Sequence, residues 1–389
     1  MLSSVSDLYS WYASLVKEVN NSNDVLVAKV KGLVQGKNSD EEKIKSVYYW
    51  VQDNIRYIAF ENGIAGFKPE AAHNVYNNKY GDCKGMANLT KEMLKLAGYD
   101  ARLTWIGTNK IAYNYAIPTL AADNHMICTV FLNGKKIYLD GTEKFISLDE
   151  NAERIQGRQV LIENGTNYIL DSIPVADKFR NKVSTEILLK MMEGNKLAGN
   201  FTTTLNGEAK TGLLYSINHT PTDKRRILLE KVITNGNKSL FIDNIQNSSL
   251  VVREMPFVIS CDYTALNKVS VFESDVYVEL EHEYYFKDFT IKPERVSDIV
   301  FDEKILRTSK VSLSVPTGYK ISHLPANYEV LHEAFSFKVS FAQKNGMVHY
   351  NNEISVTKGI IGKEDFKAWN DAIQGLKKAY NDKLVLTKI

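Results

Sequence analysis

The sequence predicts an α+β fold with a mixed N-terminal part and a C-terminal part that is rich in strands. Apolar residues recur at helical spacing within residues 41–96, alternate with polar residues over much of the remaining chain, and form a closing helical stripe over residues 363–382. We therefore divide the chain into an α+β domain of residues 1–176 and a β-rich, sandwich-like region of residues 177–389 that carries a terminal helix.

Two helices are predicted in the first domain. Residues 41–58 form an amphipathic helix whose apolar face comprises Ile44, Val47, Val51, Ile55 and Ile58. A second helix begins at Cys83, directly after Asp82 as its N-cap, and ends just before Gly98. The apolar stripe of this second helix comprises Met86, Leu89, Met93 and Leu96.

Strands follow the second helix. Residues 101–108 alternate as a strand, and residues 125–142 predict a hairpin around the dipeptide Asn133-Gly134, which favours a tight two-residue turn. Residues 159–164 and 166–172 are also strand-like and complete the domain.

The second region reads as strands for most of its length. Strands are predicted within residues 185–192, 200–207, 257–264, 274–286, 310–315 and 335–342. Asn345-Gly346 marks a turn after the last of these, and residues 223–234 are helical in pattern.

Composition narrows the class of protein. The chain has 389 residues, 44% of them hydrophobic and 24% charged, with a formal net charge of +2, which is typical of a globular protein and not of a nucleic-acid binder. No apolar stretch approaches the roughly 20 residues of a membrane span, and no signal peptide is visible. Three widely spaced cysteines exclude a complete disulfide framework and show no zinc-binding pattern. The compartment stays open between the cytosol and export to the periplasm or beyond.

Cys83 is the first candidate for chemistry. The start of a helix carries unpaired backbone amides and a positive dipole end, and both favour a thiolate. The amide of Cys83 is also suitably placed for an oxyanion that forms when the sulfur attacks a carbonyl carbon. A single cysteine is more often a buried core residue, so a base and its partner are needed to support this reading.

The predicted hairpin supplies that pair. With Asn133 and Gly134 as loop residues, His125 and Asp140 fall on one face as diagonal neighbours, roughly 7–8 Å apart at the backbone. The opposite face carries apolar residues, namely Met126, Cys128, Val130, Ile137 and Leu139. The register therefore brings a histidine and a carboxylate within hydrogen-bonding reach, as a Cys-His-Asp triad requires.

These segments resemble the transglutaminase-like superfamily, and in particular bacterial members proposed to be cysteine proteases. The resemblance rests on Trp50-Val51 with Ile55-Arg56-Tyr57, Gly81-Asp82-Cys83, Asn124-His125, and Leu139-Asp140-Gly141-Thr142. It covers roughly residues 40–150, and the order cysteine, histidine, aspartate is the papain-like one.

The resemblance implies a papain-like core with Cys83 as nucleophile, His125 as general base and acid, and Asp140 as the residue that orients the histidine. Two positions depart from the family pattern: Gly85 stands where many relatives have an acidic residue, and Gly141 stands where proline is common. Many relatives also carry a β-rich domain before the core, so this chain is compatible with a fragment of a longer protein. The second oxyanion donor stays open among Asn77, Asn78 and Tyr80.

Other features receive a structural interpretation. Glu281-His282-Glu283 cannot chelate one metal ion from one side of a strand, so we expect an exposed strand there. Cys128 and Cys261 are expected to be structural. Trp105 is expected in the core rather than in a substrate groove.

The sequence thus predicts a cysteine-dependent hydrolase or acyltransferase for a peptide or protein substrate, with no cofactor and no metal. The alternative is a non-catalytic scaffold or binding protein whose β-rich half mediates adhesion or assembly. In either case we expect no nucleic-acid partner.

Overall fold

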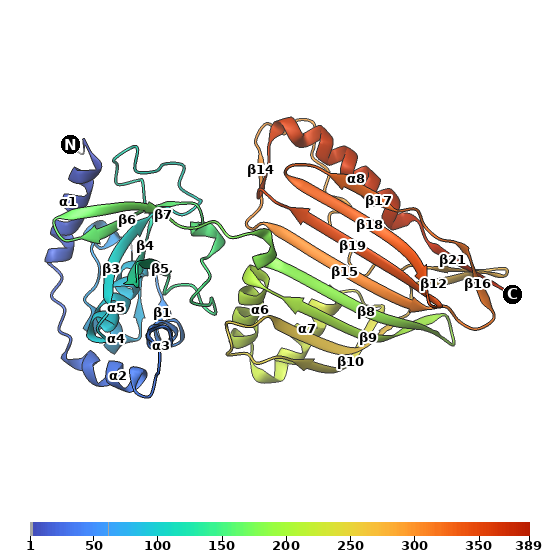
Figure 1. Cartoon of the computed structure of the whole chain (residues 1–389), viewed down its shortest axis with the longest axis horizontal. Helices are drawn as coiled ribbons and strands as arrows, with labels where there is room; N and C mark the ends of the chain where they lie inside the picture. The colour runs from blue at the N-terminus through green and yellow to red at the C-terminus, as the bar shows by residue number, and fades with distance from the viewer. Residues whose placement is uncertain (1–2, 61) are drawn as a thin grey trace. The chain divides into compact units, whose positions relative to one another are not determined.

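A computed structural model describes residues 3–60 and 62–389. The chain forms two compact units, residues 1–176 and residues 177–389 (Figure 1). The first unit combines helices with one main sheet, and the second is built largely from strands, in agreement with the predicted α+β class.

The first unit contains five α-helices among its described residues: α1 Val5–Lys17, α2 Asp24–Val34, α3 Asp40–Asn54, α4 Ala72–Asn78 and α5 Cys83–Leu96. Its main sheet has the strand order β5-β4-β3-β6-β7 and is antiparallel throughout. The bounds of these strands are β3 Asp100–Ile106, β4 His125–Leu132, β5 Lys135–Leu139, β6 Gln159–Asn164 and β7 Asn167–Ser172. A short parallel pair, β1 Arg56–Tyr57 and β2 Tyr80–Gly81, joins the ends of two helices.

Local sequence explains how the predicted helices begin and end. Ser39 caps α3, and Glu42 reaches back to the backbone of Ser39, which completes a capping box. This helix ends at Asn54, because the chain turns there into β1, so the predicted extension to residue 58 was too long. Gly98 follows α5 with a φ of 92°, a left-handed conformation that glycine adopts without strain.

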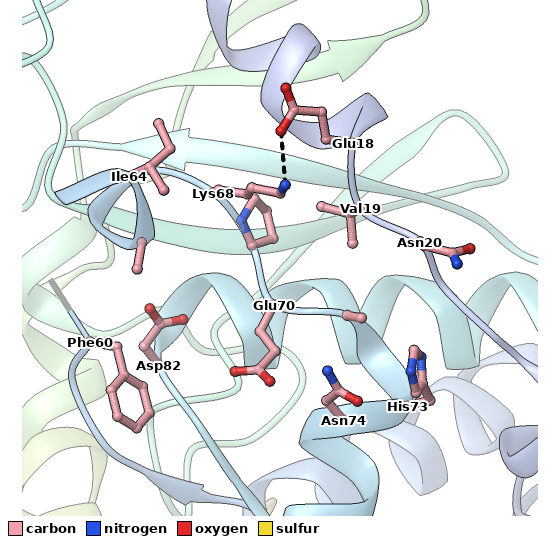
Figure 2. Close-up of a pocket in the computed structure, with 13 residues that line it drawn as sticks. Glu18, Val19, Asn20, Phe60, Ile64, Lys68, Glu70, His73, Asn74 and Asp82 are labelled. Carbon is pink, nitrogen blue, oxygen red and sulfur yellow. Dashed lines mark hydrogen bonds and ion pairs between the residues drawn. The ribbon is translucent and has the colours of Figure 1, made fainter. Parts of the chain in front are cut away.

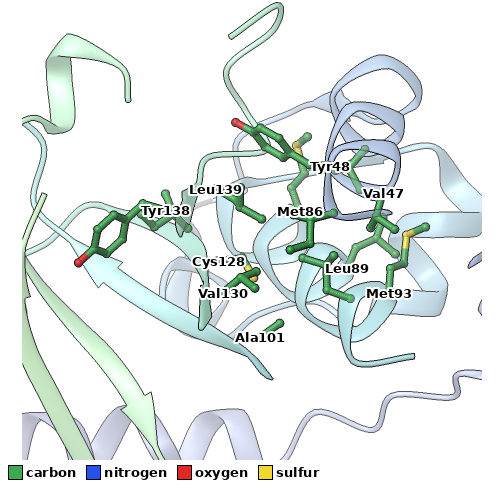
Figure 3. Close-up of a cluster of buried hydrophobic side chains, with 14 of the residues drawn as sticks. Val47, Tyr48, Met86, Leu89, Met93, Ala101, Cys128, Val130, Tyr138 and Leu139 are labelled. Carbon is green, nitrogen blue, oxygen red and sulfur yellow. The ribbon is translucent and has the colours of Figure 1, made fainter. Parts of the chain in front are cut away.

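Helix α5 lies at the centre of the first unit. Every residue from Cys83 to Leu94 is buried, and the helix packs against β3 and β4. Figure 3 shows the resulting cluster, in which Met86, Leu89 and Met93 of α5 face Val47 of α3 and Val130 of β4. Because close-packed side chains hold their rotamers, this core fixes the position of the α5 N-terminus relative to the sheet.

A second apolar cluster lies beneath α1. Tyr9 and Tyr12 of α1 pack against Trp105 of β3, and the Tyr12 and Trp105 rings are stacked with centroids 5.0 Å apart. Met126 of β4 belongs to the same cluster. The N-terminal helix is thereby tied to the end of the sheet where β4 begins.

The second unit is organised around an eight-stranded sheet of order β10-β11-β9-β8-β15-β19-β18-β17. The strands are β8 Lys182–Met192, β9 Lys196–Leu205, β10 Leu240–Asn247, β11 Phe257–Ala265, β15 Ile305–Ser314, β17 Tyr328–Leu331, β18 Phe335–Lys344 and β19 Met347–Val356. Neighbours are antiparallel except for β8 and β15, which run parallel.

Smaller elements complete this unit. A four-stranded sheet has the order β12-β13-β21-β16, with β12 Val269–Phe272, β13 Asp275–Val278, β16 Tyr319–His323 and β21 Leu384–Lys388. A two-stranded pair joins β14 Ile299–Val300 to β20 Ile360–Ile361. The helices are α6 Gly207–His219, α7 Arg225–Thr234 and α8 Phe366–Asn381.

Helix α8 is the last helix, and its predicted apolar stripe is largely buried. Trp369 is fully buried among the rings of Phe286, Phe335 and Phe337, and its indole nitrogen donates to the carbonyl of Phe289. Strand β21 follows α8 along the chain.

Two expectations for the second unit were wrong. Helix α6 was missed, because Gly207 and Gly212 lower its helix propensity and only a short apolar stripe marks it. The strand predicted over residues 274–286 ends at Val278, and Glu281 lies in a buried loop instead of on an exposed strand. The Glu281 carboxylate accepts hydrogen bonds from Tyr350 and Asn352, which explains how the loop buries a charged group.

Candidate active site

Cys83 is the first residue of α5. The side chain of Asp82 caps the helix by accepting a hydrogen bond from the amide of Gly85 at 2.8 Å. The amides of Cys83 and Lys84 belong to the first turn, where helical amides have no intrahelical partner. Packing explains why residue 85 is glycine, because a Cβ there would stand 3.0 Å from a methyl group of Val75 on α4. A side chain at this position would force α4 away from the start of α5.

His125 and Asp140 are positioned by the hairpin. Strands β4 and β5 pair in the register that the Asn133-Gly134 turn predicts, with Cys128 opposite Leu139. His125 is the first residue of β4, and Asp140 follows directly on the last residue of β5. Because the two strands are antiparallel, both side chains emerge at the same end of the sheet.

The three side chains meet. His125 Nε2 lies 2.8 Å from Asp140 Oδ2, and the Cys83 thiol lies close enough to the same imidazole to help raise its pKa. Since Nε2 is directed at Asp140, the ring nitrogen that remains for Cys83 is Nδ1. All three residues are nearly buried, with exposed fractions of 8% for Cys83, 7% for His125 and 3% for Asp140.

Electrostatics favour a charged His125–Asp140 pair. Burial lowers the pKa of His125, but the adjacent charge of Asp140 and the hydrogen bonds to Asp140 and Cys83 outweigh it and raise that pKa to about 9. Burial acts in the opposite direction on Asp140, yet the charge of His125, their hydrogen bond and the charge of Arg154 hold the pKa of this carboxyl far below its usual range. A protonated imidazole facing a carboxylate is therefore the favoured state near neutral pH.

Arg154 is a fourth member of this site, and no motif in the sequence indicates it. It belongs to a short 3₁₀ turn, Glu153–Ile155, and its Nη2 donates to Asp140 Oδ2 at 2.8 Å. The same nitrogen lies 3.2 Å from His125 Nε2. When His125 is protonated, Arg154 Nη2 and His125 Nε2 both donate to Asp140. The contact between these two nitrogens is then not a hydrogen bond, because neither of them can accept. Arg154 also binds Glu143 through Nε, which fixes the guanidinium plane.

The other oxygen of Asp140 is satisfied by Thr142. The Thr142 backbone amide and its hydroxyl donate to Asp140 Oδ1 at 3.1 and 2.7 Å. The backbone carbonyl of Asp140 accepts from the buried hydroxyl of Tyr48 at 3.0 Å. Asp140 is thus held from both sides, which leaves it little freedom to rotate away from His125.

A cavity of about 360 Å³ lies against Cys83 and His125. Its walls come from α1, the loop before α4, the start of α5, β3, and the loop that leads into β4. The lining residues are Tyr12, Gly66, Phe67, Cys83, Lys84, Trp105, Leu120, Asp123, Asn124, His125 and Met126. Trp105 is buried as expected, but it also lines this cavity, so the core and groove interpretations both apply to it. Asn77, Asn78 and Tyr80 are not among the lining residues.

A second hollow lies beyond the N-cap of α5. It measures about 490 Å³ and is lined by Asp82 but by none of the three triad candidates. Figure 2 shows Lys68 reaching across its wall to Glu18, a contact of 2.8 Å. Glu70 and Asp82 also face this hollow, and Asp82 is paired with Lys84 at 2.5 Å. The two hollows therefore have separate linings near the start of α5, and the nucleophile candidate lines only one of them.

The remaining cysteines differ from Cys83. Cys128 is fully buried in β4, and burial raises the pKa of its thiol to about 12. Cys261 is buried in β11, where burial and then the charge of Asp262 raise its pKa to about 12. Both positions agree with the structural roles expected for them.

Two searches of the described residues bear on other classes of function. Over residues 3–60 and 62–389, no group of three or more histidine, cysteine, aspartate or glutamate side chains could hold a metal ion. Within the same ranges, no helix is long and apolar enough to cross a bilayer.

Comparison with protein-family models supports the first unit's resemblance. Residues 27–140 match the model of the transglutaminase-like superfamily, and this range contains Cys83, His125 and Asp140. Residues 27–140 form a transglutaminase-like core. Arg154 lies outside the matched range. Residues 270–386 match a second model, that of a domain of unknown function with solved structures, DUF3858.

Two solved structures are similar to this chain. One, from Parabacteroides distasonis, is a protein proposed to be a protease; it is 10% identical, with a TM-score of 0.59 over 99% of this chain and 59% of that chain. This chain therefore spans less than two thirds of that protein's length. Another, a proposed cysteine protease from Cytophaga hutchinsonii, is 18% identical over 32% of this chain and 40% of that chain. Its TM-score of 0.26 is too low to indicate a shared fold. No curated protein matches the sequence.

Proposed function

We propose that this chain is a cysteine-dependent amide-bond hydrolase or acyltransferase that acts on a peptide or protein substrate through Cys83, His125 and Asp140. The observation that carries the proposal is the position of His125, between the Cys83 thiol and the Asp140 carboxylate, at the wall of a cavity. The match of residues 27–140 to the transglutaminase-like superfamily supports the same chemistry at the level of the family.

In this mechanism, His125 is protonated when the sulfur of Cys83, as a thiolate, attacks the substrate carbonyl carbon. The amide of Cys83, at the helix start, donates to the oxyanion of the tetrahedral intermediate. His125 then gives its proton to the leaving nitrogen as the carbon–nitrogen bond breaks, which leaves a thioester on Cys83 and releases an amine. Water, or a second amine, attacks the thioester carbon and gives a proton to the now neutral His125. The carbon–sulfur bond then breaks, which releases the acid or the new amide and restores Cys83.

The residues around His125 suit this cycle. Asp140 faces Nε2 and holds the imidazole so that Nδ1 faces Cys83, and it stabilises the imidazolium that donates to the leaving nitrogen. Arg154 and Thr142 occupy the remaining acceptor positions of Asp140, which keeps that carboxyl ionised. Arg154 is therefore a positioning residue in this proposal, since it acts through Asp140.

Trapping the thioester tests the proposal. The protein is mixed with a peptide library, quenched in acid and weighed intact by mass spectrometry, and the adduct is then located by peptide mapping. We expect an acyl adduct on Cys83 that hydroxylamine removes, and none in Cys83→Ala. Cys128→Ala is the matched control and should still form the adduct. The absence of any Cys83-dependent adduct or turnover across the library would favour the non-catalytic scaffold instead.

A further inference from the structure

The cavity beside Cys83 and His125 has apolar walls. Phe67, Leu120 and Met126 contribute to its lining, and the stacked rings of Tyr12 and Trp105 form another part of it. An aliphatic chain can therefore lose its hydration along these walls at a gain in free energy.

One carboxylate stands among these apolar groups. Asp123 lines the cavity and is partly exposed to it. Its oxygens accept hydrogen bonds from Tyr12 at 2.9 Å and from Tyr115 at 3.2 Å. No lysine, arginine or histidine within the described residues forms an ion pair with Asp123. The Asp123 carboxylate thus has hydrogen-bond donors but no positively charged partner among the described residues.

The cations among the described lining residues belong to other carboxylates, since protonated His125 is paired with Asp140. Lys84 is buried and paired with Asp82 at 2.5 Å, so its charge is balanced at the start of α5. A carboxylate without a counter-charge is costly in surroundings of low polarity, and a bound cation would remove that cost. Burial accordingly raises the pKa of Asp123 to about 7, against the opposing effect of the two tyrosine hydroxyls.

Trp105 gives an independent sign of a ligand. Its side chain is 3% exposed and lines the cavity, yet within the described part of the chain its indole Nε1–H has no hydrogen-bond acceptor. A buried donor without a partner is costly, which is why such groups often indicate a missing water or ligand beside them.

We propose that this cavity is a subsite for an alkylammonium group, in which the aliphatic chain lies along Phe67, Leu120 and Met126 and the ammonium group pairs with Asp123. This inference rests on the proposed function and names the substrate class: an amide substrate with a lysine-like side chain near the scissile bond, or an amine that binds as the ammonium, gives a proton to Asp123 and then attacks the thioester. Both sources present the same group, an ammonium at the end of an apolar chain.

A binding experiment tests the subsite without relying on turnover. Pentylammonium and 1-pentanol have the same chain and differ in charge, and each is titrated into Cys83→Ala while the indole N–H signal of Trp105 is followed by NMR. That signal is assigned by its loss in Trp105→Phe. We expect pentylammonium to shift it and to bind about 10- to 100-fold more tightly than pentanol. Equal binding of the two probes, or binding of neither, overturns the proposal.

The Asp123→Asn variant sharpens this result, because asparagine keeps an oxygen acceptor for the tyrosines but carries no charge. We expect the preference for pentylammonium to disappear in it, while the exposed control Asp24→Asn keeps the preference. Thermal unfolding by circular dichroism checks that each variant is folded. If Asp123→Asn does not fold, the comparison of the two probes in Cys83→Ala still decides the matter.

A kinetic experiment separates the two sources. Matched peptides with lysine or norleucine at each position near the scissile bond are compared with unmodified protein. A ratio of kcat/KM of about 10 or more in favour of lysine at one position, abolished by Asp123→Asn, assigns the subsite to the acyl donor. If pentylammonium binds and instead accelerates loss of the thioester, the subsite belongs to the attacking amine. Failure of all turnover with intact binding would refute the proposed function but not the subsite.

Discussion

The two units of this protein bury charged groups in different ways. In the first unit, His125, Asp140 and Arg154 are clustered beside a thiol at the wall of a cavity. In the second unit, Glu281 is equally buried, but its carboxylate is bound by Tyr350 and Asn352. Burial raises the pKa of Glu281 although these donors oppose the change.

The difference lies in what the polar groups face. The Lys268 ammonium of the second unit donates to the Glu279 carboxylate and to the backbone carbonyl of Glu281. These polar groups therefore bind one another. The cysteine of that unit, Cys261, belongs to a different environment, since its thiol pKa is raised to about 12. Buried charge alone therefore does not indicate catalysis. A nucleophile and a base that share a cavity wall are what distinguish the first unit.

The largest effect is expected for the nucleophile. Cys83→Ala should reduce turnover by about 10³-fold or more, because no other group can form the thioester. Its melting temperature should stay within a few degrees of the parent, since Cys83 is held at a helix start and not deep in the core. Cys128→Ala should show the reverse, with retained turnover and lowered stability. A Cys83→Ala protein that unfolds would indicate a structural cysteine.

The orienting residue should have a smaller effect. Asp140→Asn should lower kcat by about 10²-fold and leave measurable activity, because asparagine keeps the shape but loses the charge that stabilises the imidazolium. Steady-state kinetics on the most active peptide measures this. Glu281→Gln in the second unit is the comparison and should leave kcat unchanged; a loss of activity there as large as that of Asp140→Asn would erase the contrast between the units.

Arg154 should have the smallest effect on kcat of these three residues, with a distinctive pH dependence. Replacement by glutamine removes the positive charge that lowers the pKa of Asp140, so that pKa should rise. We expect kcat to fall by about 10-fold and the acid limb of its pH profile to move to higher pH, with partial rescue by Arg154→Lys. The matched control is Arg102→Gln, which removes a partly exposed ion pair with Asp100. An unshifted acid limb in Arg154→Gln would leave Arg154 with a structural role only.

Stability should depend on pH in opposite directions in the two units. The folded-state pKa of His125 is raised from 6.5 to about 9, so its contribution is fully present below 6.5 and is lost as pH rises through about 9. The pKa of His282 is lowered to about 4, first by burial and then by Lys268, so stability is lost as pH falls from 6.5 towards 4.

Denaturant unfolding of His125→Gln and His282→Gln against pH measures these contributions. Each substitution should remove a slope of up to about 1.4 kcal/mol per pH unit, on the alkaline side for His125 and on the acid side for His282. Slopes of the same sign for the two histidines would contradict this assignment of their charge states.

Much of the candidate site could be predicted from local sequence. The Asn133-Gly134 turn fixes the register of β4 and β5, and this register places His125 beside Asp140. Asp82 before an apolar helical stripe likewise predicts that Cys83 begins a helix. These predictions succeed because they depend on contacts between residues close in the chain, where turn and capping preferences are strong.

The remainder depends on contacts that no local pattern announces. Arg154 lies in a short 3₁₀ turn and reaches Asp140 only because the loop after β5 folds back over the sheet. Asp123 lies in a polar loop, and its neighbour Tyr12 is more than a hundred residues away in sequence. Glu281 was misread because alternation around it continues past the end of β13. The positions of all three residues depend on how separate segments of the chain pack together. That packing cannot be recognised from local patterns in a single sequence.

Selective alkylation of the full chain tests the central claim most directly. The folded protein is exposed to limiting iodoacetamide at about pH 7, and the labelling rates of Cys83, Cys128 and Cys261 are read by peptide mapping. We predict that Cys83 reacts at least about 100-fold faster than the other two, and that His125→Ala removes most of this advantage. Labelling of Cys83 at the rate of Cys261, or a rate for Cys83 that does not change in His125→Ala, would contradict the account.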